Sequence, residues 1–195
     1  SNFSNVFQVK NINSGKKVKS FIENKKPTTA VVVGAGYIGL EVAEQLKERG
    51  IKVIILQRGK HPMSHLDWDM SIRIEDEMVK QGIDFRPEET IQSLVGDTQL
   101  DEVITNKGTK LSADMYILAT GVRPNVALAQ SIGVKLGKAG AIATDNTLQT
   151  NIPDVYAVGD VAESFHVITG KPIYRPLAST ANKMGRIAGD AMTGG

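Results

Sequence analysis

Apolar positions follow the clearest pattern of the whole chain between residues 28 and 57. TTAVVV (28–33) and KVIIL (52–56) are apolar runs of strand length. Between them, Ile38, Val42 and Leu46 recur at every fourth position, which predicts one apolar face of a helix that ends at Gly50. A strand, a glycine turn, a helix and a second strand in this order predict a βαβ unit of a parallel sheet.

A second helix is predicted over residues 67–81. Met70, Ile74 and Met78 fall on one face of it, and Gly82 follows at its end. A methionine stripe at helical spacing is typical of a packed core, so we assign these residues to the core rather than to a cofactor site.

The remaining apolar runs are shorter and are separated by turn residues. Residues 83–111 predict an antiparallel excursion beside the parallel sheet, because their β-rich runs alternate with hairpin-type turns. MYILAT (115–120) and VYAVG (155–159) predict buried strands, and 177–191 predict a final helix. These elements predict an α/β fold with a Rossmann-like three-layer domain at 27–145.

Composition excludes several classes of partner. A formal net charge of +2 leaves no broad cationic surface for a nucleic acid, and the lysine-rich segment 1–26 is interpreted as a solvated leader or linker. The longest apolar runs fall short of the roughly 20 residues that a membrane helix needs, so no membrane partner is expected. The chain has no cysteine, which is compatible with the expected cytoplasmic location and excludes a thiol nucleophile.

The glycine turn at 34–39 fits the pattern G-x-G-x-x-G. Gly34 permits a tight turn, Gly36 lets the backbone approach a pyrophosphate, and Gly39 lets the helix lie close to the strand. Unpaired N–H groups at the start of the helix favour the negative charge of the phosphates. Its position between a strand and a helix predicts a nucleotide-binding site, with a purely structural tight turn as the alternative.

The end of the second strand decides between NADH and NADPH in this kind of fold, because an acidic residue there binds the ribose 2′-hydroxyl. Gln57 holds that position, and Arg58 and Lys60 follow it. A neutral glutamine does not repel the 2′-phosphate of NADPH, and the two cations can pair with it, so NADPH is favoured. NADH stays the alternative, with Gln57 bonded to the ribose and Arg58 in solvent.

No catalytic residue and no metal site are expected. The histidines are His61, His65 and His166, and Pro62 argues against a helix that would bring the first two onto one face. No G-x-S-x-G segment occurs. Glu41 lies in the first turn of the predicted helix, where ordering a cofactor is a better interpretation than general base catalysis.

Four segments resemble the pyridine nucleotide-disulfide oxidoreductase family, and in particular its coenzyme A-disulfide reductase and NADH oxidase branch. They are VVVGAGYIGLE, ATGVRPN at 119–125, TNIPDVYAVGD at 150–160 and HVITGKPIYRPLASTANKMGRIAGD at 166–190. The resemblance extends over nearly the whole chain. It implies that in the full-length parent a hydride passes from NAD(P)H to FAD.

The resemblance also implies roles for individual residues. Pyrophosphate binding falls to the three glycines of the turn, and the nicotinamide half lies near Tyr37, Ile38 and Glu41, with Gly121 lining the same cleft. Asp160 hydrogen-bonds the ribityl chain of FAD, and it is expected to follow the strand 155–159. The isoalloxazine ring lies beside Pro176, Leu177 and Ala178.

Two features of the family are missing from the sequence: a second glycine fingerprint for FAD with its redox-active cysteine, and a dimerisation domain. We therefore interpret the chain as a fragment, with a nicotinamide-binding domain at 27–145 and the C-terminal part of a split FAD domain at 146–195. The parent is expected to be a homodimer. The fragment is expected to bind the nucleotide, to lack the parent reaction, and to self-associate through 146–195.

Two alternatives stay open at this point. The first is a stand-alone module that binds or senses NAD(H) without redox chemistry, against which Asp160 and the Pro176 segment argue. The second is a dehydrogenase acting directly on a small substrate, for which no acid or base stands out in the sequence.

Overall fold

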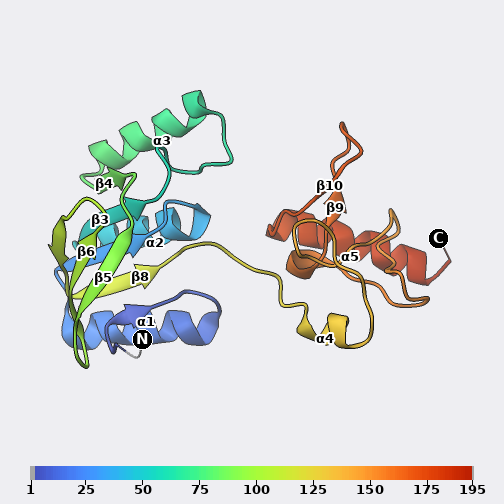
Figure 1. Ribbon diagram of the computed structural model, residues 1–195, viewed down its shortest axis with the longest axis horizontal. Helices are drawn as coiled ribbons and strands as arrows, with labels where there is room; N and C mark the ends of the chain where they lie inside the picture. Colours follow the sequence, from blue (N-terminus) through green and yellow to red (C-terminus); the bar gives the residue numbers. More distant parts are fainter. Residues whose placement is uncertain (1–2, 195) are drawn as a thin grey trace. The chain divides into compact units, whose positions relative to one another are not determined.

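The computed structural model describes residues 3–194 and divides into two compact units, the first ending at Gly121 and the second beginning at Val122. Each unit is described by itself (Figure 1). The division lies before the boundary near 145 that the sequence predicts. The reason is that the loop-rich stretch after Gly121 packs with the second unit, where Val134 and Ile142 belong to its core.

A parallel sheet of five strands forms the centre of the first unit, in the order β1-β8-β2-β3-β4. The strands are β1 (Val6–Phe7), β2 (Thr29–Val33), β3 (Lys52–Gln57), β4 (Asp84–Pro87) and β8 (Met115–Leu118). Parallel neighbours need a crossover, which α2 (Tyr37–Glu48) and α3 (Trp68–Lys80) provide. This confirms the predicted βαβ unit and the predicted strand at 115–120.

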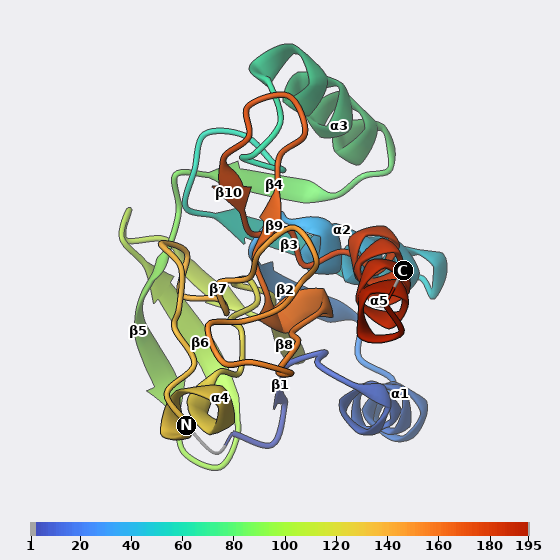
Figure 2. The same ribbon diagram turned by 90° about the vertical axis from the view of Figure 1, so that its right-hand side faces the viewer.

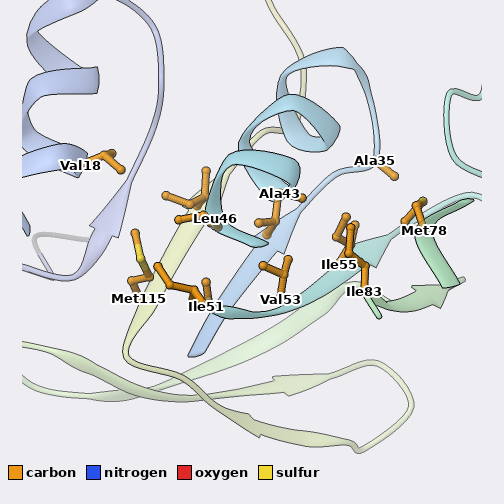
Figure 3. Packing of buried hydrophobic residues seen from close by; sticks show 13 residues of the cluster. Val18, Ala35, Ala43, Leu46, Ile51, Val53, Ile55, Met78, Ile83 and Met115 are labelled. Atoms are coloured by element: carbon orange, nitrogen blue, oxygen red, sulfur yellow. The ribbon is translucent and has the colours of Figure 1, made fainter. Parts of the chain in front are cut away.

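Helices cover one face of this sheet. Ala30 and Val32 of β2 alternate with residues of the other face and belong to the core around Leu46. Val53 and Ile55 of β3 lie in the same core (Figure 3). Within α2, the buried residues are Gly39, Ala43 and Leu46, so the helix face is rotated from the predicted stripe at Ile38 and Val42. Val42 still packs against this core as a partly buried residue.

An antiparallel sheet covers the opposite face and completes three layers. Its strands are β5 (Ile91–Gly96), β6 (Leu100–Thr105) and β7 (Lys110–Ser112), in that order (Figure 2). Val103 and Leu111 pack there against Val31, Ile54 and Tyr116 of the parallel sheet. The three-layer α/β fold is thus confirmed, and the predicted antiparallel excursion forms from Ile91 onward. Its first part was wrong, because Asp84–Pro87 pair parallel to β3 in the main sheet.

The predicted second helix forms, but only part of its methionine stripe is buried. Met78 lies in the core and Ile74 packs against it, whereas Met70 is 53% exposed. Met70 stands in the first turn of α3, and a buried Ser71 takes the inward position beside it. The assignment of Met70 to the core was wrong.

Residues before Pro27 are part of the first unit, which corrects their interpretation as a leader or linker. β1 pairs with β8, and α1 (Ile12–Lys25) begins with a capping box between Asn11 and Ser14. The side chain of Asn5 is buried, donates to the carbonyl of Leu100 at 2.9 Å and accepts from its N–H at 2.9 Å. These backbone contacts fasten the segment to the sheets.

The second unit is built from short elements around a small apolar core that includes Leu148, Met184 and Ala188. Its elements are α4 (Ala127–Ser131), the 3-10 turn η1 (Gly159–Val161), β9 (Ser164–Phe165), β10 (Pro172–Ile173) and α5 (Ala178–Met192). The final helix was predicted. The strand at 155–159 does not form, because only Tyr156 pairs, through a single bridge to Gln149.

Candidate nucleotide-binding site

Gly34 makes the turn out of β2. Its φ of +107° is in the left-handed region, and its N–H donates to the carbonyl of Leu56 at 2.8 Å. A Cβ atom at this position would collide with the carbonyl oxygen of Ala119. Both the conformation and the close approach of β8 therefore require glycine.

Gly36 and Gly39 differ in what surrounds them. Gly36 is the N-cap of α2, and no atom lies within 4 Å of the place where its Cβ would stand. A Cβ at Gly39 would meet the carbonyl of Gly34, which shows how closely the helix lies against the turn. Since no side chain caps α2, its first N–H groups are free to bind an anion approaching over Gly36.

Both backbone polar groups of Ala35 are hydrogen-bonded. Its N–H donates to Oε1 of Gln57 at 3.1 Å, and its carbonyl accepts from the N–H of Met63 at 2.8 Å. Nε2 of Gln57 donates in turn to the carbonyl of His61 at 3.3 Å. The carboxamide of Gln57 thus joins the glycine turn to the loop formed by residues 58–66, the 58–66 loop hereafter.

A cleft of about 660 Å³ opens at the carboxyl ends of β2, β3, β4 and β8. Ligands of open α/β sheets bind at this edge. We call this space the nucleotide cleft; it is lined by residues 33–36, 56–59, 64–65, 89–91 and 118–121. It brings together five residues of the sequence-based expectation: Gly34, Gly36, Gln57, Arg58 and Gly121.

The other expected residues of the nicotinamide side lie outside this lining. Tyr37 and Glu41 line a separate groove of about 560 Å³ between α2 and α3, and Ile38 is half-buried in the first turn of α2. The hydroxyl of Tyr37 lies 3.1 Å from Nε2 of His65, a residue that does line the nucleotide cleft. Lys60 is exposed on the 58–66 loop.

Arg58 is exposed beside the cleft, directly after β3. Within the part of the chain that the structure describes, its guanidinium has no carboxylate within 4.0 Å. The group is therefore available to a charged ligand, as is the ammonium of Lys60.

Glu89 is a residue of the cleft that the sequence reasoning missed. Only 8% of it is exposed, and among residues 3–194 its Oε2 atom has no hydrogen-bond partner. It lies in the polar stretch FRPEET, which gives no sign of burial. Its signal appears only once β4 is known to be a parallel strand, because ligand contacts collect at the carboxyl ends of parallel strands.

Asp160 lies in the turn η1 and is exposed, not at the end of a strand as the sequence predicts. It borders a hollow of about 370 Å³ together with residues 122–125, Val161 and Tyr174. The hydroxyl of Tyr174 donates to the backbone carbonyl of Asp160 at 2.8 Å. Burial, and to a smaller extent the charge of Asp160, raises the pKa of Tyr174.

The remaining flavin-side residues lie at the start of α5. Leu177 is the N-cap, Ala178 is the first helical residue, and Pro176 precedes both. In the described part of the second unit, no glycine turn joins a strand to a helix. The exposed carboxylate of Asp160 fits a hydrogen bond to a ribityl chain, but this unit supplies no cradle for the flavin's pyrophosphate.

Clusters of metal-ligating side chains and long apolar helices are both absent from residues 3–194. No three His, Cys, Asp or Glu side chains come close enough together there to hold a metal ion. No helix of this range has the length and apolar character needed to cross a bilayer.

The parallel α/β unit and its cleft define a Rossmann-like fold of the kind that holds dinucleotides in many proteins. The sequence profile of the pyridine nucleotide-disulphide oxidoreductase family matches residues 4–185, so the chain belongs to this family. The NAD(P)H sulfur oxidoreductase (CoA-dependent) of Pyrococcus furiosus is 41% identical over 178 residues, which are 91% of this chain and 40% of the relative. Relatives named coenzyme A disulfide reductase and NADH oxidase match as well.

Solved structures show the same fold. Reduced CoADR-RHD of Bacillus anthracis superposes with a TM-score of 0.94 at 32% identity, covering 99% of this chain and 34% of that protein. An engineered water-forming NADPH oxidase bound to NADPH, a variant of the Lactobacillus brevis NADH oxidase, gives a TM-score of 0.83 at 31% identity, with 95% and 41% covered. This chain spans about 40% of the length of the curated relatives named above.

Proposed function

We propose that this chain is the nicotinamide dinucleotide-binding portion of a flavin-dependent oxidoreductase. The observation that carries the proposal is the glycine turn 34–39, which faces the nucleotide cleft from the uncapped start of α2. A pyrophosphate over Gly36 would receive hydrogen bonds from free N–H groups and favourable charge from the helix dipole. Membership of the family supports the same ligand.

The reduced nicotinamide supplies the hydride that FAD accepts in the parent enzyme. The role of this chain is to hold the dinucleotide in a fixed position. The hydrogen bonds of the Ala35 N–H and carbonyl keep the glycine turn in one conformation. Asp160 and the start of α5 would contribute to the flavin side. We also propose that the full-length parent is a homodimer.

NADPH is the preferred nucleotide in this proposal. The carboxamide of Gln57 is used within the protein, and no acid stands at its position to repel a 2′-phosphate. Arg58 lies beside the cleft with its guanidinium free for that phosphate. The engineered NADPH oxidase was changed in the same sense: an aspartate became alanine, and the residue after it became arginine. In that oxidase, one of the replaced glycines lies as many residues before the aspartate as Gly39 lies before Gln57 in this chain. This equal spacing supports a match between the aspartate and Gln57.

Titration calorimetry of the 195-residue chain with NADPH and with NADH tests the proposal. We expect one site per chain and the tighter binding for NADPH. Equal or tighter binding of NADH would refute the preference, and binding of neither nucleotide would refute the function. An absorption spectrum of the same purified sample shows whether the chain retains FAD.

A further inference from the structure

Glu89 is attached to the end of β3, beside the adenosine end that Gln57 and Arg58 mark. Its N–H donates to the carbonyl of Gln57 at 3.0 Å, and the N–H of Glu88 donates to the carbonyl of Gly59 at 3.2 Å. Glu89 is one of the residues that line the nucleotide cleft. It comes from the segment after β4, so the cleft receives a carboxylate from the neighbouring strand although β3 itself ends without one.

The carboxylate of Glu89 is buried without a partner for Oε2. Donors close to it are used elsewhere. The N–H of Thr90 donates to Oδ1 of Asn106 at 2.8 Å, and the guanidinium of Arg86 pairs with Asp84 at 2.9 Å. The charge of Arg86 acts on Glu89, but no group of the described residues donates a hydrogen bond to its Oε2 atom. A buried carboxylate oxygen without a hydrogen bond is costly, so the site calls for a donor.

The adenosine end of a nicotinamide dinucleotide offers two kinds of hydrogen-bond donor, the exocyclic amine of adenine and the ribose hydroxyls. The phosphates offer only acceptors and negative charge, which a carboxylate repels. A terminal carboxylate torsion is broad and roughly two-fold, so the carboxylate of Glu89 can rotate to meet a donor on a bound ligand. The amine is the donor that NADH and NADPH share and that lies farthest from the phosphate charge.

We propose that Glu89 recognises the adenine ring by accepting a hydrogen bond from its exocyclic amine. This inference rests on the proposed function and adds the residue that selects the base. It separates two tasks at the ends of neighbouring strands: Arg58 after β3 recognises the 2′-phosphate, and Glu89 after β4 recognises the base.

A nucleotide that lacks the amine tests the inference. Deamino-NADPH carries hypoxanthine, which has an acceptor, the 6-oxo group, in the place of the amine. Its N1–H is a donor, but it points in another direction in the ring plane. The unaltered 195-residue chain should bind NADPH at least about tenfold more tightly than deamino-NADPH, the effect expected of a hydrogen bond to a charged group. Equal affinities would overturn the role of Glu89 and leave the proposed function intact, whereas binding of neither nucleotide would overturn both.

Glu89→Gln identifies the residue responsible. A carboxamide can accept from the amine and can also donate to the 6-oxo group, so the discrimination should fall to within about twofold. Glu88→Gln is the matched control, because it removes the same charge from the exposed neighbour and should keep the tenfold difference. Unchanged discrimination in a folded Glu89→Gln chain would overturn the assignment. The comparison of the two nucleotides on the unaltered chain decides the issue if this variant does not fold.

Discussion

Single residues of the glycine turn are constrained by backbone geometry. Gly34 combines a positive φ with a collision between any Cβ and the carbonyl of Ala119. Gly50 has a positive φ of +76° and open space around it. The pair therefore separates the cost of the backbone conformation from the cost of the collision.

Gly34→Ala should lower the free energy of unfolding by about 3 kcal/mol, the sum of a strained conformation and overpacking against backbone. Gly50→Ala should cost only about 1 kcal/mol, since it adds the strain alone. Urea denaturation followed by circular dichroism measures both. Equal losses in the two variants would show that the contact with Ala119 has no energetic weight.

Arg58→Ala should weaken NADPH binding about tenfold and leave NADH binding nearly unchanged, because only NADPH carries the phosphate that the guanidinium would bond. Lys52→Ala removes an exposed cation from the opposite end of β3 and serves as the control. Calorimetry of the unaltered chain and of the two variants, each with NADPH and with NADH, measures the affinities to be compared. An equal effect of Arg58→Ala on NADH would contradict a bond to the 2′-phosphate.

At this scale the sequence predicts what a residue needs locally but not where the fold places it. Gly34 and Gly36 were predicted because a turn between a strand and a helix restricts its own residues. The burial of Glu89 depends on β3 and β4 being neighbours, which no local pattern contains. The two hydrogen bonds of Gln57 likewise join segments that only the folded chain brings together.

Among the elements, β2 and β8 are joined where they begin. Oδ2 of Asp114, just before β8, accepts from the N–H groups of Thr28 and Thr29 at 2.7 and 2.9 Å and from their hydroxyls at 2.9 and 3.0 Å. These hydrogen bonds, that of the Thr28 N–H first, lower the pKa of Asp114. The ionised carboxylate thus holds the edge of the sheet opposite to the nucleotide cleft.

Asp114→Ala should lower the stability by about 1 kcal/mol at pH 7, a figure reduced for the solvent that reaches this site. The folded pKa lies below the unfolded one, so the contribution of Asp114 is complete above about pH 4 and is lost as the pH falls through the folded pKa. Urea denaturation of the unaltered chain and of Asp114→Ala, repeated from pH 7 to pH 2.5, should show that the difference between their free energies of unfolding becomes smaller.

Helices were predicted better than isolated strands. The helix α2 follows from its own periodicity, although Gly39 and Ala43 rotate its buried face away from Ile38. The run VYAVG has strand composition, but a strand exists only through its partners, and Tyr156 finds a single one. β1 was not predicted from the polar segment 1–26, because its extended conformation depends on pairing with β8.

For the whole molecule, the division after Gly121 has a direct test. The first unit contains both apolar cores of the three-layer fold and the complete lining of the nucleotide cleft. A chain shortened to end at Gly121 should unfold cooperatively and bind NADPH with an affinity within about twofold of the 195-residue chain. Loss of binding in a folded shortened chain would show that residues after Gly121 complete the site.

Self-association belongs to the same scale. The turn between β9 and β10 presents Val167 and Ile168 with 98% and 90% of their surface exposed, and Phe165 lies beside them at 37%. Apolar surface of this kind favours association, so the 195-residue chain should form oligomers that the shortened chain does not. Light scattering of both distinguishes these states, and a monodisperse monomer of the longer chain would contradict the expectation.

The exposed start of α3 gives the protein a built-in optical reporter. Trp68 is the single tryptophan of the sequence, it is 66% exposed, and it stands two residues after the 58–66 loop. Reduced nicotinamide absorbs light in the range where tryptophan emits. Bound NADPH should therefore quench the emission of Trp68 by energy transfer, and because no other indole contributes, the loss of signal would report occupancy of the first unit without any label.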